Sequence, residues 1–372
     1  MAIPLRSSTV NHMNEQLNEA LSPEDCASRI FELSGVKIDP EVASDLWLQI
    51  LNHKWFLSEK VGRTVGIRPA SIDFLENVKL APDEYTTYKH RNILNEMGAQ
   101  AIGRNIWDTI ADSQPPKQLV NRRIILPLTE AGLSKKHGVV PPKTILFFGP
   151  PGTGKTHFAR AIAGVLSWWY VEIVPSMLMT DGIEKTGARL RSIMEKARSL
   201  DEAILFIDEF EEIAASRDNA DRIDKSITNE FLKQVPLLKS QGNRILLVCA
   251  TNYIRQLDEA MLRPGRFDCI IPVGVLDREG AKTILNNHVS KLNTGEIDLD
   301  RIAVMTSGFT PADIEYLFQK IAQYAFEQEL ATKADYRVTT ETLLRIIPTI
   351  RPSLTDKAIK EFEKEVADYS RV

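Results

Sequence analysis

The sequence predicts an α/β fold, in which a parallel sheet with helices on both faces lies between an all-helical N-terminal region and a small helical C-terminal region. Short runs of β-branched and aromatic residues alternate with amphipathic stretches between residues 145 and 273. Apolar residues recur at helical spacing from residue 22 to about 78, and strand-like runs stop after about residue 277. These observations indicate three domains, 1–104, 105–275 and 276–372.

The N-terminal domain, residues 1–104, reads as a small helical module. Apolar residues follow the helical period in 27–31 and 43–51, with interruptions at Gly35 and Gly66. The module could serve as a partner-binding unit. Its large aromatic residues fit packing between helices better than a partner-binding groove, and both readings stay open: Trp47, Trp55 and Phe56.

The central domain, residues 105–275, carries the strand signals. Candidate breaks in the chain lie at Pro82 and at the proline pairs 115–116 and 141–142, because proline cannot continue a helix. A helical stretch at 157–166 follows the first strand. Five runs are expected to be strands buried on both faces: 145–148, 170–174, 203–207, 245–250 and 269–273.

The C-terminal domain, residues 276–372, shows only helical periodicity. It is expected to form a small helical lid. Its predicted helices cover 278–292, 311–330, 340–346 and 355–369.

Composition narrows the functional class. The formal net charge of −4 gives no electrostatic footprint for strong nucleic-acid binding. The three cysteines are far apart and form no ligand-spaced cluster with the six histidines, so we expect no metal other than Mg²⁺. No apolar run approaches the ~20 residues that span a bilayer, and the first residues lack a signal-peptide core. We therefore expect a cytoplasmic location and no membrane span.

A glycine-rich loop follows the first predicted strand and opens the helix at 157–166. Such a strand, turn and helix direct several backbone N–H groups at phosphate oxygens. Glycine permits the tight turn, Lys155 can reach the β and γ phosphates, and the Thr156 hydroxyl can bind Mg²⁺. A plain connection between strand and helix is disfavoured because both flanks fit. The loop therefore predicts a nucleoside triphosphate site built by Gly149, Pro150, Pro151, Gly152, Thr153, Gly154, Lys155, Thr156 and His157.

Two acids end the third predicted strand. Asp208 and Glu209 follow the buried run 203–207, at the edge where a parallel sheet presents its ligands. Asp208 would complete the Mg²⁺ shell, and Glu209 would orient or deprotonate a water molecule. Alternatively, both acids could merely cap a helix at 210–215, a reading that the nearby glycine loop makes less attractive.

The fourth predicted strand ends at Thr251 and Asn252, and an Arg-Pro-Gly-Arg run at 263–266 follows. With these motifs in this order, residues from about Trp107 to near the C terminus resemble the AAA ATPases, especially the clade of katanin, spastin and the valosin-containing proteins. The resemblance implies a P-loop NTPase sheet domain with a helical lid.

The resemblance also implies roles for further residues. Asn252 matches a sensor that helps place the water molecule. Arg263 and Arg266 match two arginines that reach the nucleotide of a neighbouring subunit, where a planar cation neutralises charge on the transferred phosphoryl group; solvated loop charges are the alternative. Ile110 and Ala111 resemble the segment beside adenine, although Asp112 replaces a common small residue.

The sequence departs from the family pattern at two places, both in segments that couple ATP hydrolysis to movement of a substrate or of a neighbouring subunit. The aromatic residue that grips peptide in threading members is missing from Gly182, Ile183 and Glu184; the run 177–179 could substitute only if the loop were shifted. In the helix after the acid pair, Pro236 and Leu237 replace an Asp-Gly pair. The hydrolytic residues are intact.

The resemblance thus predicts a Mg²⁺-dependent ATPase that works in an oligomeric ring, expected to be a hexamer, and remodels a protein partner or adaptor-bound substrate. The alternative is a nucleotide-switched binding scaffold that threads nothing. The negative net charge argues against a third hypothesis, a protein that loads or remodels complexes on DNA. A small-molecule kinase fits poorly because the paired acids suit water as the acceptor.

Overall fold

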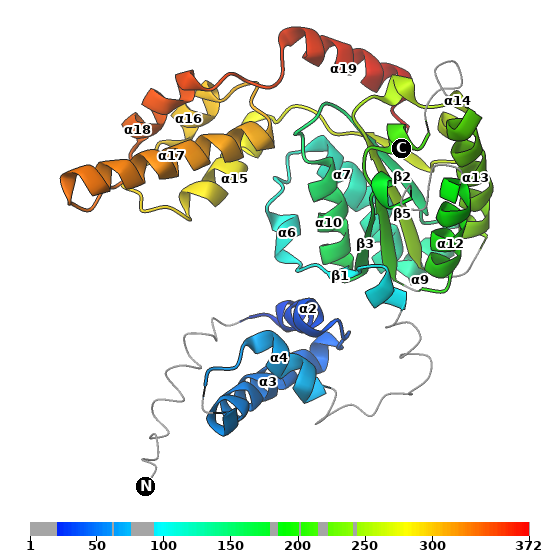
Figure 1. Ribbon diagram of the computed structural model, residues 1–372, viewed down its shortest axis with the longest axis horizontal. Coiled ribbons are helices and arrows are strands. Elements are labelled where there is room, and N and C mark those ends of the chain that lie inside the picture. Colours follow the sequence, from blue (N-terminus) through cyan, green and yellow to red (C-terminus); the bar gives the residue numbers. More distant parts are fainter. Residues whose placement is uncertain are drawn as a thin grey trace.

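The computed structural model describes residues 21–61, 63–75, 93–178, 185–200, 202–214, 222–240 and 244–371, without the side chains of 222–226. A central sheet body is flanked by an N-terminal helical group and by C-terminal helices (Figure 1). Within these ranges no helix is long and apolar enough to cross a bilayer.

The sheet has six strands in the order β1-β3-β4-β5-β2-β6. All neighbours pair in parallel except β1, which pairs antiparallel with β3. The five predicted strands are confirmed to within one residue or so at their ends, whereas β1 was not predicted. The strands are β1 (Gln100–Ala101), β2 (Thr144–Phe148), β3 (Trp169–Ile173), β4 (Ala203–Ile207), β5 (Ile245–Thr251) and β6 (Cys269–Pro272).

Helices cover both faces of this sheet, as the fold class required (Figure 1). Successive residues of a strand point to opposite faces. In β2, Ile145 and Phe147 join one apolar cluster, and Leu146 and Phe148 join the other. The first cluster is covered by α6 (Asn105–Asp108), α7 (Pro115–Val120), the π-helical turn η2 (Asn121–Ile125) and α10 (Lys155–Leu166); the second by α12 (Thr186–Arg198) and α13 (Arg222–Lys239).

Short elements connect these layers. Of the helix expected at 210–215, the described residues show only a 3₁₀ turn, Phe210–Glu212, and position 215 lies outside them. The others are α8 (Leu126–Thr129), α9 (Ala131–Lys136), α11 (Pro175–Leu178), η5 (Ile254–Gln256) and α14 (Glu259–Leu262).

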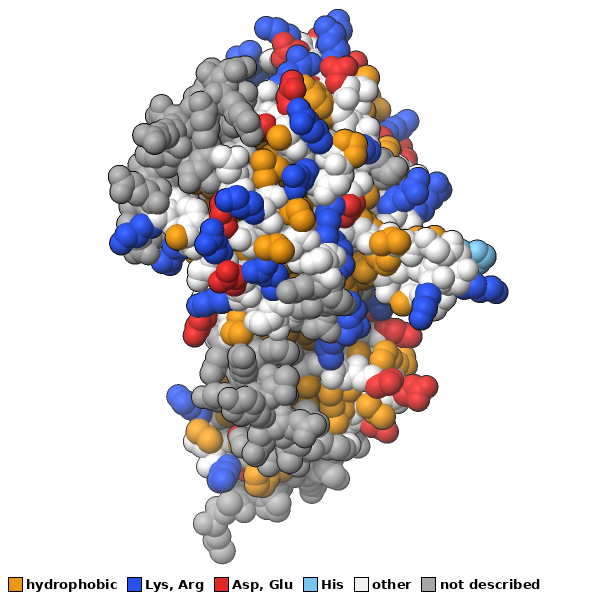
Figure 2. Space-filling view, turned by 90° about the vertical axis from the view of Figure 1, so that its right-hand side faces the viewer, with side chains coloured by type: hydrophobic (Ala, Val, Ile, Leu, Met, Phe, Trp, Pro, Cys, Tyr) orange, Lys and Arg blue, Asp and Glu red, His pale blue; other side chains and the backbone are white. Residues whose placement is uncertain are grey.

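Lysine and arginine side chains gather on the face of the sheet body that Figure 2 shows, although the whole chain carries a formal net charge of −4. Several cations of α12 and α13 are held in ion pairs with neighbouring acids, which offsets their charge. The pairs are Arg191–Glu230, Lys196–Glu96, Arg198–Glu195 and Lys239–Asp268.

The helices after the sheet form a cluster of their own around buried residues such as Leu285, Leu317 and Leu343. Side-chain caps begin them: Asp277 accepts from the Gly280 N–H, and Thr310 forms a capping box with Asp313. The members are α15 (Arg278–Val289), α16 (Leu299–Met305), α17 (Pro311–Thr332), α18 (Thr340–Ile346) and η6 (Ile347–Thr349). Helix α16 was not predicted.

The last helix, α19 (Asp356–Tyr369), leaves that cluster and crosses to the sheet body (Figure 1). Its Phe362 joins the apolar cluster of the sheet and packs against Phe148, with 6.0 Å between ring centroids. The range 276–372 was expected to form a helical lid, but α19 at its end packs on the strands instead.

The N-terminal helices α2 (Pro23–Ser34), α3 (Pro40–Val61) and α4 (Ile67–Asp73) pack around their own small core. Trp47 is buried there as expected, whereas Trp55 and Phe56 are 44% and 54% exposed. The group meets the sheet edge through Phe31, whose ring lies 5.3 Å from that of Trp169.

Candidate functional site

A cavity of about 620 Å³ lies where the glycine loop, the segment before α7 and the C-terminal helices meet. This volume is in the range of small-molecule sites. A second hollow of about 740 Å³, beside α8 and α9, is lined by no glycine. The cavity brings together most of the predicted site residues: Ile110, Ala111, Pro151, Gly152, Thr153, Gly154, Lys155, Thr156, His157, Asp208, Glu209 and Asn252. Gly149 and Pro150, also predicted, are not among the residues that line it.

The backbone of the loop demands glycine at defined positions. Gly152 and Gly154 have φ angles of +77° and +94°, in the left-handed region. A Cβ atom at Gly149 would lie 2.1 Å from the carbonyl oxygen of Val273. The loop then opens α10, whose first-turn N–H groups lack intrahelical partners. This cradle fits the phosphates of a nucleotide.

Lys155 is buried inside the loop. Its Nζ donates to the carbonyl oxygens of Gly149 and Pro150, each at 2.8 Å. Burial lowers the pKa of Lys155 to about 8, and the nearby carboxylates of Asp208 and Glu211 oppose this shift. A buried cation whose hydrogen bonds go to neutral carbonyl oxygens would be stabilised by an anionic phosphate beside it.

Thr156 and Asp208 meet at the start of α10 and the end of β4. The Thr156 hydroxyl donates to Oδ2 of Asp208 at 2.7 Å. A hydroxyl and a carboxylate are oxygen ligands that suit Mg²⁺, so the pair fits a magnesium ion bound beside the phosphates. The sequence predicted both residues, because Thr156 follows the lysine of the loop and Asp208 follows a buried strand.

Glu209 lines the cavity from a strained backbone. Its φ is +49°, which is costly for a residue with a side chain, and its N–H donates to Oδ1 of Asp208 at 2.9 Å. The strand end and the preceding carboxylate thereby hold Glu209 at the cavity.

The segment 109–112 is fixed by two contacts. The Thr109 hydroxyl lies 2.7 Å from Nε2 of His157, whose pKa burial lowers, with Arg160 adding to the shift. Lys117 donates to the Ile110 carbonyl oxygen at 2.5 Å and pairs with Asp112 at 2.8 Å. Asp112, the departure from the family pattern, therefore anchors this segment through a lysine.

Comparisons with known proteins agree with this geometry. Residues 145–275 match the family described as ATPase family associated with various cellular activities (AAA). The chain carries an AAA ATPase domain. The resemblance inferred from the motifs is thereby confirmed.

Relatives of the AAA domain include the cell division cycle protein 48 homolog of Archaeoglobus fulgidus, 32% identical over 72% of this chain and 39% of that protein. A proteasome-activating nucleotidase of Methanoculleus marisnigri is 33% identical over 60% of this chain and 55% of its own length. The chain thus matches less than two thirds of either relative. The crystal structure of the FIGL-1 AAA domain shares the fold, with a TM-score of 0.65 and 24% identity over 78% of this chain and 99% of that chain.

Sequence reasoning missed one acid in the AAA domain. Glu211 Oε1 accepts from the Asn252 N–H at 3.2 Å, and its other oxygen, Oε2, is buried without a hydrogen-bond partner in the described part of the chain. Glu211 thus tethers the residue that resembles the sensor. The acid run after Asp208 was the available signal.

Sequence reasoning expected a helical lid in 276–372 but did not identify α15 as part of the cavity wall. One face of α15 carries lining residues at positions 280, 284, 287 and 288, a helical spacing that could have been recognised, and Lys291 adds to them just after the helix ends. From outside α15, Gln114 and Glu315 also contribute.

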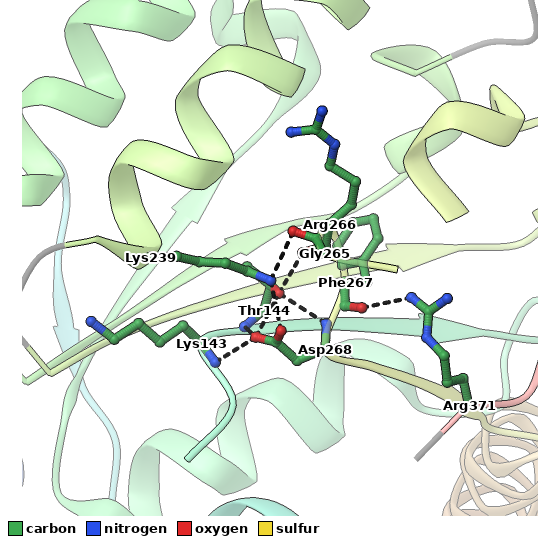
Figure 3. Close-up of polar contacts among 8 residues, drawn as sticks. All are labelled: Lys143, Thr144, Lys239, Gly265, Arg266, Phe267, Asp268 and Arg371. Carbon is green, nitrogen blue, oxygen red and sulfur yellow. Dashed lines mark hydrogen bonds and ion pairs between the residues drawn. The ribbon is translucent and has the colours of Figure 1, made fainter. Parts of the chain in front are cut away.

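Arg263 and Arg266 do not line the cavity of their own AAA domain. They lie in the loop between α14 and β6, where Arg263 is exposed and Arg266 Nη1 donates to the Leu232 carbonyl oxygen at 2.8 Å. Figure 3 shows the Arg266 side chain pointing away from the polar cluster around Asp268. The structure therefore separates these two arginines from the other predicted site residues.

The residues of the expected pore loop, Gly182, Ile183 and Glu184, lie outside the described residues, as does Met179. Just before them, Leu178 is buried and Met177 is 53% exposed. Pro236 lies inside α13, and Leu237 beside it is exposed.

Proposed function

We propose that the AAA domain binds ATP with Mg²⁺ and hydrolyses it to ADP and phosphate. The observation that carries the proposal is the convergence of the glycine cradle, Lys155 and the Thr156–Asp208 pair in one cavity. Lys155 would hold the β and γ phosphates, and Thr156 with Asp208 would hold the magnesium ion, which neutralises phosphate charge when bound. Glu209 would accept a proton from the attacking water, which Asn252 helps to orient.

The same proposal assigns Arg263 and Arg266 to the nucleotide of an adjoining protomer. Both lie outside their own cavity, one exposed and one half-buried, on a loop at the surface. An arginine supplied by a neighbour contributes on the order of 10³–10⁵ in rate in related phosphoryl-transfer systems. Hydrolysis would therefore require assembly, and we propose a six-membered ring.

The output we propose is the remodelling of a protein partner. Relatives named as a proteasome-activating nucleotidase and a cell division cycle protein 48 homolog support a protein-directed role. A nucleotide-switched scaffold is the second candidate, because Gly182, Ile183 and Glu184 contain no aromatic residue to grip a peptide. A tagged substrate that is unfolded continuously during hydrolysis favours remodelling, whereas capture and release of a folded substrate favours the scaffold.

Two variants test the hydrolytic proposal directly. Glu209→Gln should keep ATP binding and lose turnover by roughly 10²–10⁴-fold, the usual contribution of a general base. Lys155→Ala should lose binding as measured by calorimetry. Glu363→Gln, an exposed change on α19, is the matched control and should leave both quantities unchanged. Unchanged phosphate release by Glu209→Gln would contradict the assignment.

A further inference from the structure

The last described residue returns to the loop that carries Arg263 and Arg266. After α19 ends, Arg371 and Ile270 of β6 form an isolated antiparallel bridge. The Ile270 N–H donates to the Arg371 carbonyl oxygen at 2.6 Å, and the Arg371 N–H donates back at 3.0 Å. The chain end is thus attached to the strand that follows the arginine loop.

The Arg371 side chain joins the two ends of that loop. Its Nη1 donates to the carbonyl oxygen of Leu262 at 2.7 Å, and its Nη2 to that of Phe267 at 2.6 Å. Figure 3 shows the second bond, with Arg371 reaching Phe267 from the side opposite Lys239. Leu262 ends α14, and its carbonyl is one that helix termini leave without an intrahelical partner. The planar guanidinium suits two acceptors at a fixed separation.

Other elements hold the middle of the loop. Lys239 Nζ donates to the Gly265 carbonyl oxygen at 3.2 Å and to Asp268 at 2.6 Å. The Thr144 hydroxyl donates to the Arg266 carbonyl oxygen at 2.7 Å. These contacts come from α13 and β2, whereas Arg371 holds the same loop from the segment after α19 (Figure 3).

The same C-terminal segment also contacts the cavity of its own protomer. A Cβ atom at Gly149 would lie 3.1 Å from the Phe362 ring, and one at Gly274 would lie 2.2 Å from it. Glu365 pairs with Arg255 at 3.1 Å, three residues after Asn252. Phe362, Glu365 and Arg371 therefore contact the glycine loop, the segment after Asn252 and the arginine loop in turn.

We propose that Arg371 is a positioning residue for Arg263 and Arg266, and that it fixes the loop in the geometry that an adjoining protomer needs. The inference rests on the proposed action of these arginines on a neighbour. Arg371 touches backbone carbonyl oxygens of Leu262 and Phe267, so its effect passes through the loop.

The test replaces Arg371 by Gln. ATP binding should stay within about twofold, because the change leaves the cavity lining intact, while turnover of the assembled protein should fall by roughly 10–100-fold, since a displacement of about 1 Å can cost 10²-fold. Arg371→Lys, which keeps the charge, should recover part of the loss. Lys364→Gln removes an exposed charge from α19 and is the matched control.

Mixing experiments separate positioning from a general loss of structure. Arg371→Gln protomers keep an intact cavity, so Glu209→Gln protomers with normal arginine loops should restore their turnover in mixed assemblies. Mixing with Arg263→Ala protomers should restore nothing. Recovery of Arg263→Ala but not of Arg371→Gln by the Glu209→Gln partner would overturn the proposal for Arg371. If neither recovers, action on a neighbour is itself wrong, and the role of Arg371 fails with it.

Discussion

At the scale of single residues, the ionisation of Lys155 links nucleotide binding to pH. Burial lowers its pKa to about 8, below its ordinary value of 10.5, so the neutral form becomes common above about pH 8 in the ligand-free protein. A phosphate beside Nζ favours the charged form and raises the pKa again. At a pH between the pKa of Lys155 in the ligand-free protein and its pKa in the nucleotide-bound protein, ATP binding is accompanied by the uptake of a proton at Lys155.

We therefore predict that ATP binding near pH 9 takes up a substantial fraction of a proton at Lys155, and much less near pH 7. Titration calorimetry in buffers with different ionisation enthalpies measures this uptake. Lys155→Arg is the control, because arginine stays protonated throughout and leaves only the uptake of the nucleotide itself. Equal uptake by both proteins near pH 9 would contradict the lowered pKa of Lys155.

Residue patterns predicted the centre of the cavity but not its surroundings. Gly152, Lys155 and Asp208 were recognisable because phosphate and magnesium chemistry requires those residue types at fixed spacing. The role of Glu211 was not, because the run of acids after Asp208 does not distinguish one acid from the next, and the bond from Asn252 to Glu211 joins positions 41 residues apart. Such contacts depend on the register of neighbouring strands.

At the scale of elements, one charged contact joins α12 to α13. Arg191 Nε and Nη2 donate to the two oxygens of Glu230 at 2.8 and 3.0 Å, and Gln234 adds a bond at 2.7 Å. The bond from Arg191 is the largest cause that holds the pKa of Glu230 at about 2, against an ordinary value of 4.5. Because this pKa is depressed in the folded state, the associated stability is present above about pH 4.5.

We predict that the stability from Glu230 is lost as the pH falls from about 4.5 towards 2. Glu230→Gln should lower the free energy of unfolding by about 1.5–3 kcal/mol at neutral pH, the range for hydrogen bonds to charged groups. Its stability should also fall less steeply than that of the wild type between these pH values. Urea unfolding at several pH values measures both effects, and parallel pH profiles would refute the assignment.

Elements differ in how far local sequence determined them. Strands β2, β4 and β5 are buried along their whole length, so each appears as a nearly continuous apolar run, whereas β3 includes the half-buried Glu172. Strand β1 has only two residues, and its pairing with Trp169 and Tyr170 makes it a strand. Helix α19 was recognised from its period, but the surface that it covers was not, because an amphipathic pattern does not specify its partner.

At the scale of the whole molecule, two bodies with separate apolar clusters share the cavity. The glycine loop belongs to the sheet body, whereas Ile284, Asn287 and His288 belong to α15 of the C-terminal cluster. A ligand that contacts both bodies stabilises their arrangement as well as each body. At 100 times the dissociation constant, the added stability is about 2.7 kcal/mol.

We predict that ATP slows amide hydrogen exchange in α15 and at the start of α17 as well as in α10, because all three line the cavity. Helix α18 belongs to the C-terminal cluster but contributes no lining residue, so it serves as an internal reference and should change less. Lys155→Ala should show none of these changes. Protection confined to residues 149–156 would mean that the nucleotide contacts the sheet body alone, and the wall formed by α15 would then have no part in binding.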